Sequence, residues 1–518
     1  DITANTINNQ SGQLLANNKV TLTAANQVNN QTGHIESKEI KILDTNDANR
    51  KLTVNNSQGR IIAGKDIAIR SKGFTNTNGS ILANERADIN VVDNISYGAK
   101  DVINAKAVSL TTKGNFTNTG KLTGQERLKV TAANIYNQKD AELSSNGTTQ
   151  LTANTNIDNR GLINSVNTYL DAGTSINNYS NGRIYGDHVA IETKTLNNTP
   201  DVFTKTQVDT CVAGPGCAVE YEAILPVNGS NASQEWIDAN TTYNKKYYKV
   251  SSEPAPVIAA RQRLDIGVET LNNNPNAARA GIFNEDFSGQ AQIISNGELH
   301  IGGSLDANHE ATGKATTVNN KGASIESVGD MSISTETLNN VNAEFNKITE
   351  KLSEEKVTKW RFKNDKQNRL FDPEVLRKNS WDYYIKETDE KLGEDYNDYN
   401  YTETRYKDVV VASDAARIIS GSDIYLTGSD FLNDKSIILA GENQEVHGKE
   451  LIKESVDGLA GREFVIKDGQ YQLKEVHSHA LGSKKSLDDI GDPVPYTDIA
   501  INKNFQLAIL NQDINKTV

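Results

Sequence analysis

Apolar and polar residues alternate in short runs along most of the chain, and this is the periodicity of a β-strand. Residues 60–70 (RIIAGKDIAIR) and 127–137 (RLKVTAANIYN) are typical runs. No window carries the apolar stripe, recurring every 3.6 residues, that indicates an amphipathic helix. The sequence therefore predicts an all-β protein.

The runs belong to a repeat with a period of about 20 residues. Its frame is N-x-x-G-x-I/L-x-A, then a polar turn, then V/L/I-x-L/I, then a link ending in I/V/F/L-x-N. Two degenerate copies, at residues 98–118 and 139–159, fill the longer gaps between the glycines of the frame, which are Gly12, Gly33, Gly59, Gly79, Gly120, Gly161 and Gly182. A coil of this length with three strands and three turns is one rung of a right-handed parallel β-helix, which buries its apolar face against neighbouring rungs.

Asn and Gly recur at fixed positions of the frame. We expect each repeated Asn to tolerate the left-handed backbone at a corner and to bond its amide to the same amide one rung away. We expect the repeated Gly to supply a positive φ at a corner. A surface of asparagines that binds glycans is the functional alternative.

The repeat stops twice at the same phrase, TLNN, at residues 195–198 and 337–340. This phrase closes a rung, so we expect the following turn to accept insertions without breaking the stack. The predicted organisation is β-helix repeats at 1–198, 255–340 and 414–445, excursions at 199–254 and 341–413, and a non-repeat tail at 446–518.

The second excursion and the tail carry their own strand patterns. The arms of the second excursion predict a long antiparallel hairpin, with a short helix at KITEKLSEEK (347–356) as the alternative. In the tail we expect a hairpin that turns at Lys467–Gly469, followed by a linker with Pro493 and Pro495.

Composition supports a narrow core and limits the partners. The chain has one Met and nine Pro, and its net charge of −13 argues against sequence-independent nucleic-acid binding. No apolar run approaches the roughly 20 residues of a membrane-spanning helix. No signal peptide is present and the chain opens inside the repeat, so we expect it to be an internal part of a longer protein.

The two cysteines, Cys211 and Cys217, flank a Gly-Pro-Gly turn in CVAGPGC. We expect a disulfide between them, with a metal pair or two free thiols as alternatives. A disulfide would indicate an oxidising, extracellular setting.

Aromatic residues gather in the second excursion and the tail, and they are the candidate receptor contacts. Tyr and Trp supply large, fairly rigid contact area with a polar tip. The alternative is that these rings only cover the flank of the rod. The candidate receptor contacts, including two histidines, are Trp360, Trp381, Tyr383, Tyr384, Tyr396, Tyr399, Tyr401, Phe464, Tyr471, His477 and His479.

The sequence predicts no enzyme, no cofactor and no metal site. His477 and His479 lack a third ligand nearby, and the G-x-S-x-G and H-E-x-x-H motifs are absent. Parallel β-helices include polysaccharide lyases and hydrolases, which cluster Asp, Lys and Arg on one face. An acidic residue is not kept at the matching position of every rung here, since Asp66 aligns with Lys19 as well as with Glu85 and Asp187.

The repeat, together with residues 416–441 (ARIISGSDIYLTGSDFLNDKSIILAG), resembles filamentous haemagglutinin-type exoproteins exported by two-partner secretion. Residues 401–421 (YTETRYKDVVVASDAARIISG) are similar to the stalk of CdiA-type contact-dependent growth inhibition effectors. The resemblance covers residues 1–198 and 255–445. It implies a secreted, monomeric stalk on the bacterial surface that presents a receptor-binding region to neighbouring cells for delivery of a C-terminal toxin.

The resemblance also implies the partners. One is an outer-membrane protein or lipopolysaccharide of the target bacterium, which we expect to bind the tail or, second, the Tyr-rich excursion. The other is the outer-membrane transporter of the two-partner system, acting on an N-terminal region that we expect to lie outside this chain. A host-cell adhesin or haemophore of the same secretion family, and a polysaccharide-degrading β-helix, are the alternative functions.

Overall fold

The computed structural model describes residues 1–212, 216–227, 232–274, 290–447, 453–454, 459–478 and 484–507. The chain divides into two compact units. The first comprises Asp1–Val219, Tyr247–Phe345 and Ser413–Ser455, and the second comprises Glu220–Lys246, Asn346–Ala412 and Val456–Val518.

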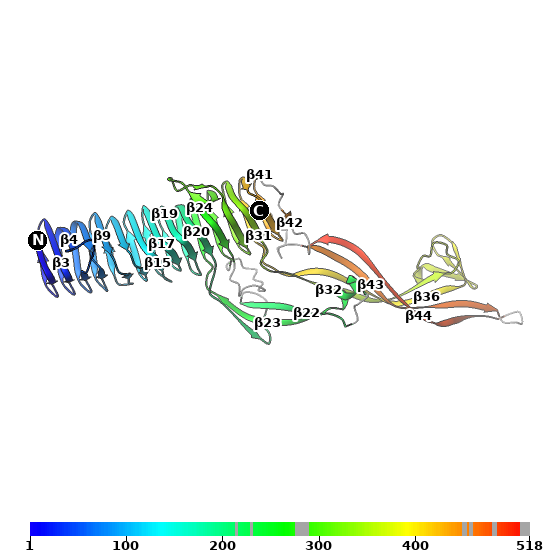
Figure 1. Ribbon diagram of the computed structural model, residues 1–518. Helices are drawn as coiled ribbons and strands as arrows, with labels where there is room; N and C mark the ends of the chain where they lie inside the picture. The colour runs from blue at the N-terminus through cyan, green and yellow to red at the C-terminus, as the bar shows by residue number, and fades with distance from the viewer. Residues whose placement is uncertain are drawn as a thin grey trace. The chain divides into compact units, whose positions relative to one another are not determined.

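The first unit is a parallel β-helix of stacked coils, as the repeat predicted (Figure 1). Within the described residues its sheet contains 32 strands. Their bounds are β1 Ile2–Asn8, β2 Gln13–Leu15, β3 Lys19–Asn29, β4 His34–Asp44, β5 Thr53–Asn55, β6 Arg60–Arg70, β7 Gly73–Thr75, β8 Ser80–Ala83, β9 Arg86–Val91, β10 Ile95–Tyr97, β11 Val102–Asn104, β12 Ala107–Thr112, β13 Phe116–Asn118, β14 Lys121–Gly124, β15 Arg127–Asn137, β16 Glu142–Ser145, β17 Thr148–Asn159, β18 Leu162–Asn164, β19 Asn167–Asn178, β20 Arg183–Asn198, β24 Val257–Asn273, β25 Gln292–Ser295, β26 Glu298–Gly302, β29 Ala315–Lys321, β30 Ser324–Ser327, β31 Met331–Val341, β37 Arg417–Ser420, β38 Ile424–Thr427, β39 Asp430–Asp434, β40 Ile437–Ala440, β41 Gln444–His447 and β42 Lys453–Glu454.

Each coil contributes three strand positions that pair in register with the next coil. Strands β8, β9 and β10 form one coil, and they pair in parallel with β11, β12 and β13 of the next. In several coils the second and third strands run together as one long strand. In β15 and β17 the register shifts at the junction, between Ala132 and Asn134, where the chain turns the corner.

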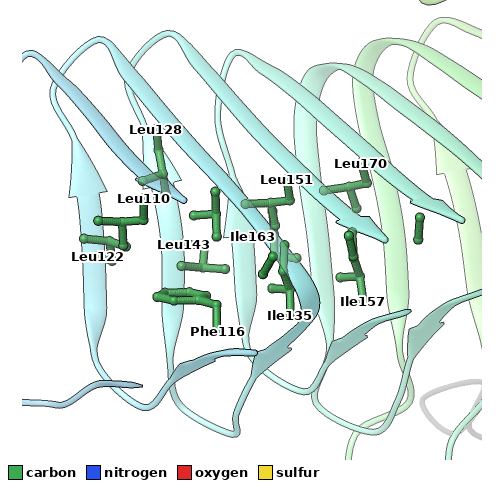
Figure 2. Close-up of a cluster of buried hydrophobic side chains, with 14 of the residues drawn as sticks. Leu110, Phe116, Leu122, Leu128, Ile135, Leu143, Leu151, Ile157, Ile163 and Leu170 are labelled. Carbon is green, nitrogen blue, oxygen red and sulfur yellow. The ribbon is translucent and has the colours of Figure 1, made fainter. Parts of the chain in front are cut away.

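The core is a set of aliphatic columns, because register pairing places equivalent side chains above one another. One column runs through Ile89, Leu110, Val130, Leu151 and Leu170 in five successive coils. Figure 2 shows Leu110, Leu151 and Leu170 pointing into the coil interior, and all five side chains are at most 1% exposed. Burial of each such side chain contributes about 1.5–3 kcal/mol, so stability is spread along the stack.

The two excursions leave this stack without interrupting it. After the first TLNN, Asn198 pairs directly with Asn273 on the next coil, and after the second, Asn340 pairs with Asn433. Within the first excursion, β21 (Phe203–Val208), β23 (Thr242–Ser252) and β22 (Cys217–Ile224) form a three-stranded sheet. Cys211 and Cys217 are joined by a disulfide there, with their Cα atoms 6.0 Å apart.

The repeated asparagines form the amide ladder that the sequence predicted. Asn9, Asn30, Asn56 and Asn76 bond in sequence, Nδ2 to Oδ1, at 2.7 Å. Tyr97 then occupies the ladder position, and its hydroxyl donates to the carbonyl oxygens of the coils around it. The ladder resumes with the same bonds through Asn118, Asn137, Asn159, Asn178, Asn198, Asn273, Asn320, Asn340 and Asn433.

The expected backbone role of the repeated Gly and Asn is wrong. Positive φ falls on the residue just before the glycine, such as Thr32 (53°) and Gln58 (57°), and on neither the ladder Asn nor the glycine of those turns. The glycine is needed for space instead. A Cβ on Gly33 would lie 2.2 Å from the Asn9 carbonyl oxygen and 2.5 Å from Asn30 Oδ1. Gly therefore lets each coil approach the ladder of the coil before it.

A small hairpin that the sequence analysis did not identify lies on the flank of the β-helix. Strands β27 (Ser304–Leu305) and β28 (Ala311–Thr312) pair antiparallel and lie close to β24. The backbone N–H of Ala311 donates to Asp265, which has a fully buried side chain and also accepts from His188 and Arg263. Burial alone would raise the pKa of Asp265, but these hydrogen bonds outweigh it and lower the pKa to about 2.

Asp265 is expected to make the β-helix less stable in acid. Because its folded pKa lies below the ordinary 3.8, the ionised group stabilises the fold above pH 4 by about 2 kcal/mol, and this is lost as the pH falls toward 2. Asp265→Asn should lower stability at pH 7 and remove this part of the pH dependence. Urea unfolding at pH 7 and pH 2.5 measures both effects. Equal stability differences between wild type and variant at the two pH values would contradict the expectation.

The second unit is built on a four-stranded sheet in the order β32 (Phe345–Phe362), β36 (Tyr396–Ser413), β43 (Ala460–Ser478), β44 (Lys485–Gln506) (Figure 1). A three-stranded sheet of β33 (Leu376–Asn379), β34 (Asp382–Ile385) and β35 (Lys391–Gly393), a 3₁₀ turn at Pro373–Val375 and helix α1 (Gln234–Asn240) complete it. The strand prediction for residues 347–356 is therefore confirmed over the helix alternative, because these residues lie within β32, which is hydrogen-bonded to β36.

Two expectations for the tail are wrong. Lys467–Gly469 is not a turn but the middle of β43, where Asp468 pairs with Thr402 on one side and Thr497 on the other. Pro493 and Pro495 lie within β44 and not in a linker. Proline is tolerated there because β44 is the edge strand, whose outward N–H groups need no partner.

A hydrophobic cluster and a group of ion pairs pack on one face of this sheet. At one end, Phe362, Leu376, Tyr383, Leu392 and Tyr396 form a buried cluster with the three-stranded sheet. At the other end, Arg462 joins Asp408 of β36 to Glu235 and Asp238 of α1.

Candidate receptor-contact surface

The predicted aromatic contacts fall into three environments. Tyr383, Tyr396 and Phe464 are 9%, 4% and 0% exposed, so they serve the core of the second unit. Trp360 also lies in this core, with its ring 4.4 Å from that of Tyr396. These four rings therefore pack within the second unit, whereas the alternative expected rings that cover the flank of the rod.

Other candidates lie at the periphery of the same unit. Trp381 and Tyr384 are half-buried on or beside β34, with Lys378 Nζ 4.8 Å from the Trp381 ring and the Arg377 guanidinium 4.5 Å from the Tyr384 ring. His477 is exposed near the end of β43, with Nε2 3.8 Å from Glu475. His479 lies outside the described residues.

The remaining candidates converge on one face of the four-stranded sheet. We call Tyr399, Tyr401, Tyr471, Tyr496 and Arg361 the tyrosine surface. Tyr399 and Tyr471 are register partners on β36 and β43, and their rings stack with centroids 4.8 Å apart. The Tyr496 ring on β44 lies 5.0 Å from Tyr399 and 5.4 Å from Tyr401, and the Arg361 guanidinium lies 4.9 Å from the Tyr399 ring.

A glycine makes this convergence sterically possible. Gly469 lies between Tyr401 and Tyr496 in the register of the three strands. A Cβ at Gly469 would lie 2.8 Å from Tyr401 Cβ and 2.3 Å from the Asn400 carbonyl oxygen. The missing side chain leaves space for the two rings to meet above the strand between them.

The environment keeps the tyrosine hydroxyls protonated. Burial is the main cause that raises the pKa of Tyr399 and of Tyr496, and together with nearby carboxylates it raises the pKa of Tyr401 to about 12. At neutral pH these groups are therefore neutral hydrogen-bond donors and acceptors.

The surface combines a rigid base with exposed rings. Tyr399 and Tyr401 are only 4% and 6% exposed, whereas Tyr471 and Tyr496 are half-buried and reach solvent. Stacked rings lose little conformational freedom on binding, and Tyr and Arg are enriched among the residues that dominate protein interfaces. The arrangement fits recognition of a protein surface, with Tyr471 and Tyr496 making the contact.

Sequence reasoning missed Tyr496 and Arg361. Tyr496 was assigned to a linker because two prolines precede it, although Val494 and Tyr496 already show strand alternation. Arg361 carries no local signal, because only the strand pairing of β32 and β36 brings it over Tyr399.

Among the described residues, no group of three His, Cys, Asp or Glu side chains is arranged to hold a metal ion. A search of the helices in the described part of the chain found none long and apolar enough to cross a membrane.

The repeat itself matches a known family. The model of the haemagglutinin repeat family matches residues 1–61, 43–120, 95–209 and 257–351, which together are more than half of the chain. Searches of curated proteins and of solved structures found no match. Members of the family are secreted surface proteins, and the repeat is a non-enzymatic, adhesin-type stalk. The chain belongs to the filamentous haemagglutinin-type family of secreted, adhesin-like stalk proteins.

Proposed function

We propose that this chain is the stalk and receptor-binding region of a CdiA-type contact-dependent growth inhibition effector. In this proposal the β-helix is the stalk, and the tyrosine surface binds an outer-membrane protein of a neighbouring bacterium so that a toxin can be delivered. The observation that carries the proposal is the stacked group of Tyr399, Tyr471 and Tyr496 on a sheet separate from the β-helix sheet.

The stalk role is supported by how the repeat uses its polar groups. Apart from the half-buried Asn433, the ladder asparagines are buried, and they bond to one another, as Asn137 and Asn159 do at 2.8 Å. Amides used in this way are not available to a ligand, so the alternative of an asparagine-lined glycan surface finds no support along this ladder. A regular stack with the same bond at most coils is suited to the role of a stalk.

The receptor role is supported by the chemistry of the tyrosine surface. Aromatic rings beside an arginine, on a rigid sheet, resemble the anchors that dominate protein–protein binding. A protein receptor fits this surface better than lipopolysaccharide, since the carboxylates near Tyr401, among them Glu403 and Asp498, would repel phosphate groups.

Substitution of the exposed rings tests the proposal. The full chain with Tyr471→Ala and Tyr496→Ala should attach to target bacteria at least about 100-fold more weakly, because two interface anchors are removed. Attachment of fluorescently labelled protein to whole cells measures this. Tyr136→Ala, a half-buried tyrosine on β15, is the matched control and should attach like wild type.

Folding and specificity are checked in the same experiment. All three tryptophans, Trp236, Trp360 and Trp381, belong to the second unit, so their fluorescence reports whether that unit is intact. An intact double variant that attaches like wild type would contradict the placement. Stronger attachment of the wild type to host cells than to bacteria would favour the host adhesin instead.

A further inference from the structure

Arg361 is the charged member of the tyrosine surface, and its guanidinium has no anionic partner. Among the described residues it makes no ion pair or hydrogen bond, and its Nε atom is buried. The guanidinium carbon lies 4.9 Å from the centre of the Tyr399 ring, and the side chain as a whole is half-buried. The ring thus holds the guanidinium in place, while none of its N–H groups donates to a described residue.

The charge of Arg361 reaches two of the tyrosines. Burial raises the pKa of Tyr399 and of Tyr496, and the positive charge of Arg361 opposes this rise in both. The guanidinium therefore lies beside the rings that the proposed receptor would contact, and it belongs to the same continuous surface.

An unpaired arginine is exceptional in the second unit. The other arginines that the structure describes in this unit each bind at least one carboxylate; they are Arg369, Arg377, Arg405 and Arg462. Lys359, two residues before Arg361 on the same strand, is also paired, with its Nζ atom 2.6 Å from Asp372 Oδ1. The missing partner is therefore a local property of Arg361.

The carboxylates near the tyrosine surface do not supply this partner. Those that act on Tyr401 each bind another cation: Asp372 binds Lys359, Glu403 binds Arg405 and Asp498 binds Lys467. Their negative charge also makes that end of the surface unfavourable for a further anion. An anionic acceptor for Arg361 would therefore come from outside the described residues and approach over Tyr399.

Binding of a protein to the tyrosine surface would remove water from Arg361. While the surface is free, water can hydrate the half-buried guanidinium. A charge that is buried without a partner is costly, so a receptor that covers Tyr471 and Tyr496 has to offer an acceptor to Arg361. A carboxylate matches the guanidinium best, because its two oxygens accept two parallel N–H bonds in one plane.

We propose that the receptor is a protein that presents an Asp or Glu side chain to Arg361. This inference rests on the proposed function, because it names the chemistry of the partner of the tyrosine surface. The partner's carboxylate accepts two hydrogen bonds from the Arg361 guanidinium, and Tyr471 and Tyr496 contact the residues around it. One carboxylate is expected and not a broad acidic patch, since Glu403 and Asp498 would repel further negative charge.

Substitution of Arg361 tests one side of this ion pair. Arg361→Ala should attach to target bacteria about 100-fold more weakly than wild type, because an interface anchor is lost. Arg361→Lys should attach about tenfold more weakly, because it keeps the charge but loses the bidentate geometry. Arg361→Glu should not attach measurably. The readout is attachment of the labelled full chain to whole cells, with tryptophan fluorescence as the check of folding. Arg127→Ala, an exposed residue of β15, is the control and should attach like wild type.

Neutralising the carboxylates of the target cells tests the other side. A water-soluble carbodiimide with ethanolamine converts exposed carboxylates into neutral amides. Attachment of the wild type to treated cells should fall to the level of Arg361→Ala on untreated cells. Arg361→Ala itself should lose little further, because the two changes remove the same interaction. Wild type that attaches equally well to treated cells would overturn the carboxylate, and so would an equal loss in both proteins.

Failure of this inference can be told apart from failure of the proposed function. If the Tyr471→Ala and Tyr496→Ala variant loses attachment while an intact Arg361→Ala attaches like wild type, the ion pair is wrong and the receptor surface stands. If both attach like wild type, the receptor surface is wrong as well. Absence of attachment by the wild type to any bacterium would overturn both.

Discussion

Gly59→Ala is expected to destabilise the β-helix by about 4 kcal/mol, whereas Gly64→Ala, five residues later, should change stability by less than about 1 kcal/mol. A Cβ on Gly59 would lie 2.1 Å from the Asn30 carbonyl oxygen and 2.6 Å from Asn56 Oδ1. It would therefore push the coil away from two members of the asparagine ladder. At Gly64 the nearest atom is Lys38 Cα at 3.5 Å, which is an ordinary contact.

Urea unfolding followed by far-ultraviolet circular dichroism measures the difference. Because a stack of repeats can unfold in part, amide hydrogen exchange over β4 and β6 should be measured as well. Loss of protection should be confined to the coils on either side of Gly59. Equal unfolding midpoints for the two alanine variants would show that close approach at this glycine does not limit stability.

The role of Gly59 depends on a contact between coils, which the sequence of one repeat does not show. The coil itself was predictable, because alternation within β6 or β15 is local and recurs in each copy. The amide ladder was predictable too, because identical residues at identical register positions must lie above one another. The glycine was misassigned because its constraint comes from Asn30 on the preceding coil, while a single copy suggests only a turn.

The second unit was harder to predict from the sequence for the same reason. Lys467–Gly469 has the composition of a turn, but pairing with β36 and β44 on both sides makes it strand, and those partners are distant in sequence. The tyrosine surface was half predicted. Tyr399, Tyr401 and Tyr471 were identified by their residue type, whereas Tyr496 and Arg361 join them only through that pairing.

Asn198→Ala is expected to have the second large effect and to lower the free energy of unfolding by about 4 kcal/mol. Asn198 is fully buried and donates from Nδ2 to Asn273 Oδ1 at 2.9 Å and to the Gln292 carbonyl oxygen at 3.0 Å. It also accepts from Asn178 Nδ2 at 2.9 Å. Alanine would leave two buried groups, Asn273 Oδ1 and Asn178 Nδ2, and the part-buried Gln292 carbonyl without this partner, and each buried group lost costs about 1–3 kcal/mol.

The neighbouring residue provides the matched control. Asn197 belongs to a second ladder on the outer side of the coil, where it donates to Asn177 and accepts from Asn272, both at 2.8 Å. This residue is half-buried, so water can replace its partners. Asn197→Ala should therefore cost less than about 1 kcal/mol. Similar losses of stability in the two variants would mean that burial does not decide how much a ladder asparagine contributes to stability.

Asn198 lies where the first excursion leaves the stack, so we expect its substitution to destabilise the coils on either side of that excursion most. Its bond to Asn273 closes a separation of 75 residues, so the two coils meet only because the excursion returns to the stack. Closing so long a loop has an entropic cost that local contacts must offset. We therefore expect Asn198→Ala to increase hydrogen exchange in β20 and β24 more than in β15 and β17. A uniform increase along the stack would instead indicate that the ladder acts as one cooperative unit, with no weak point where the chain leaves the coil.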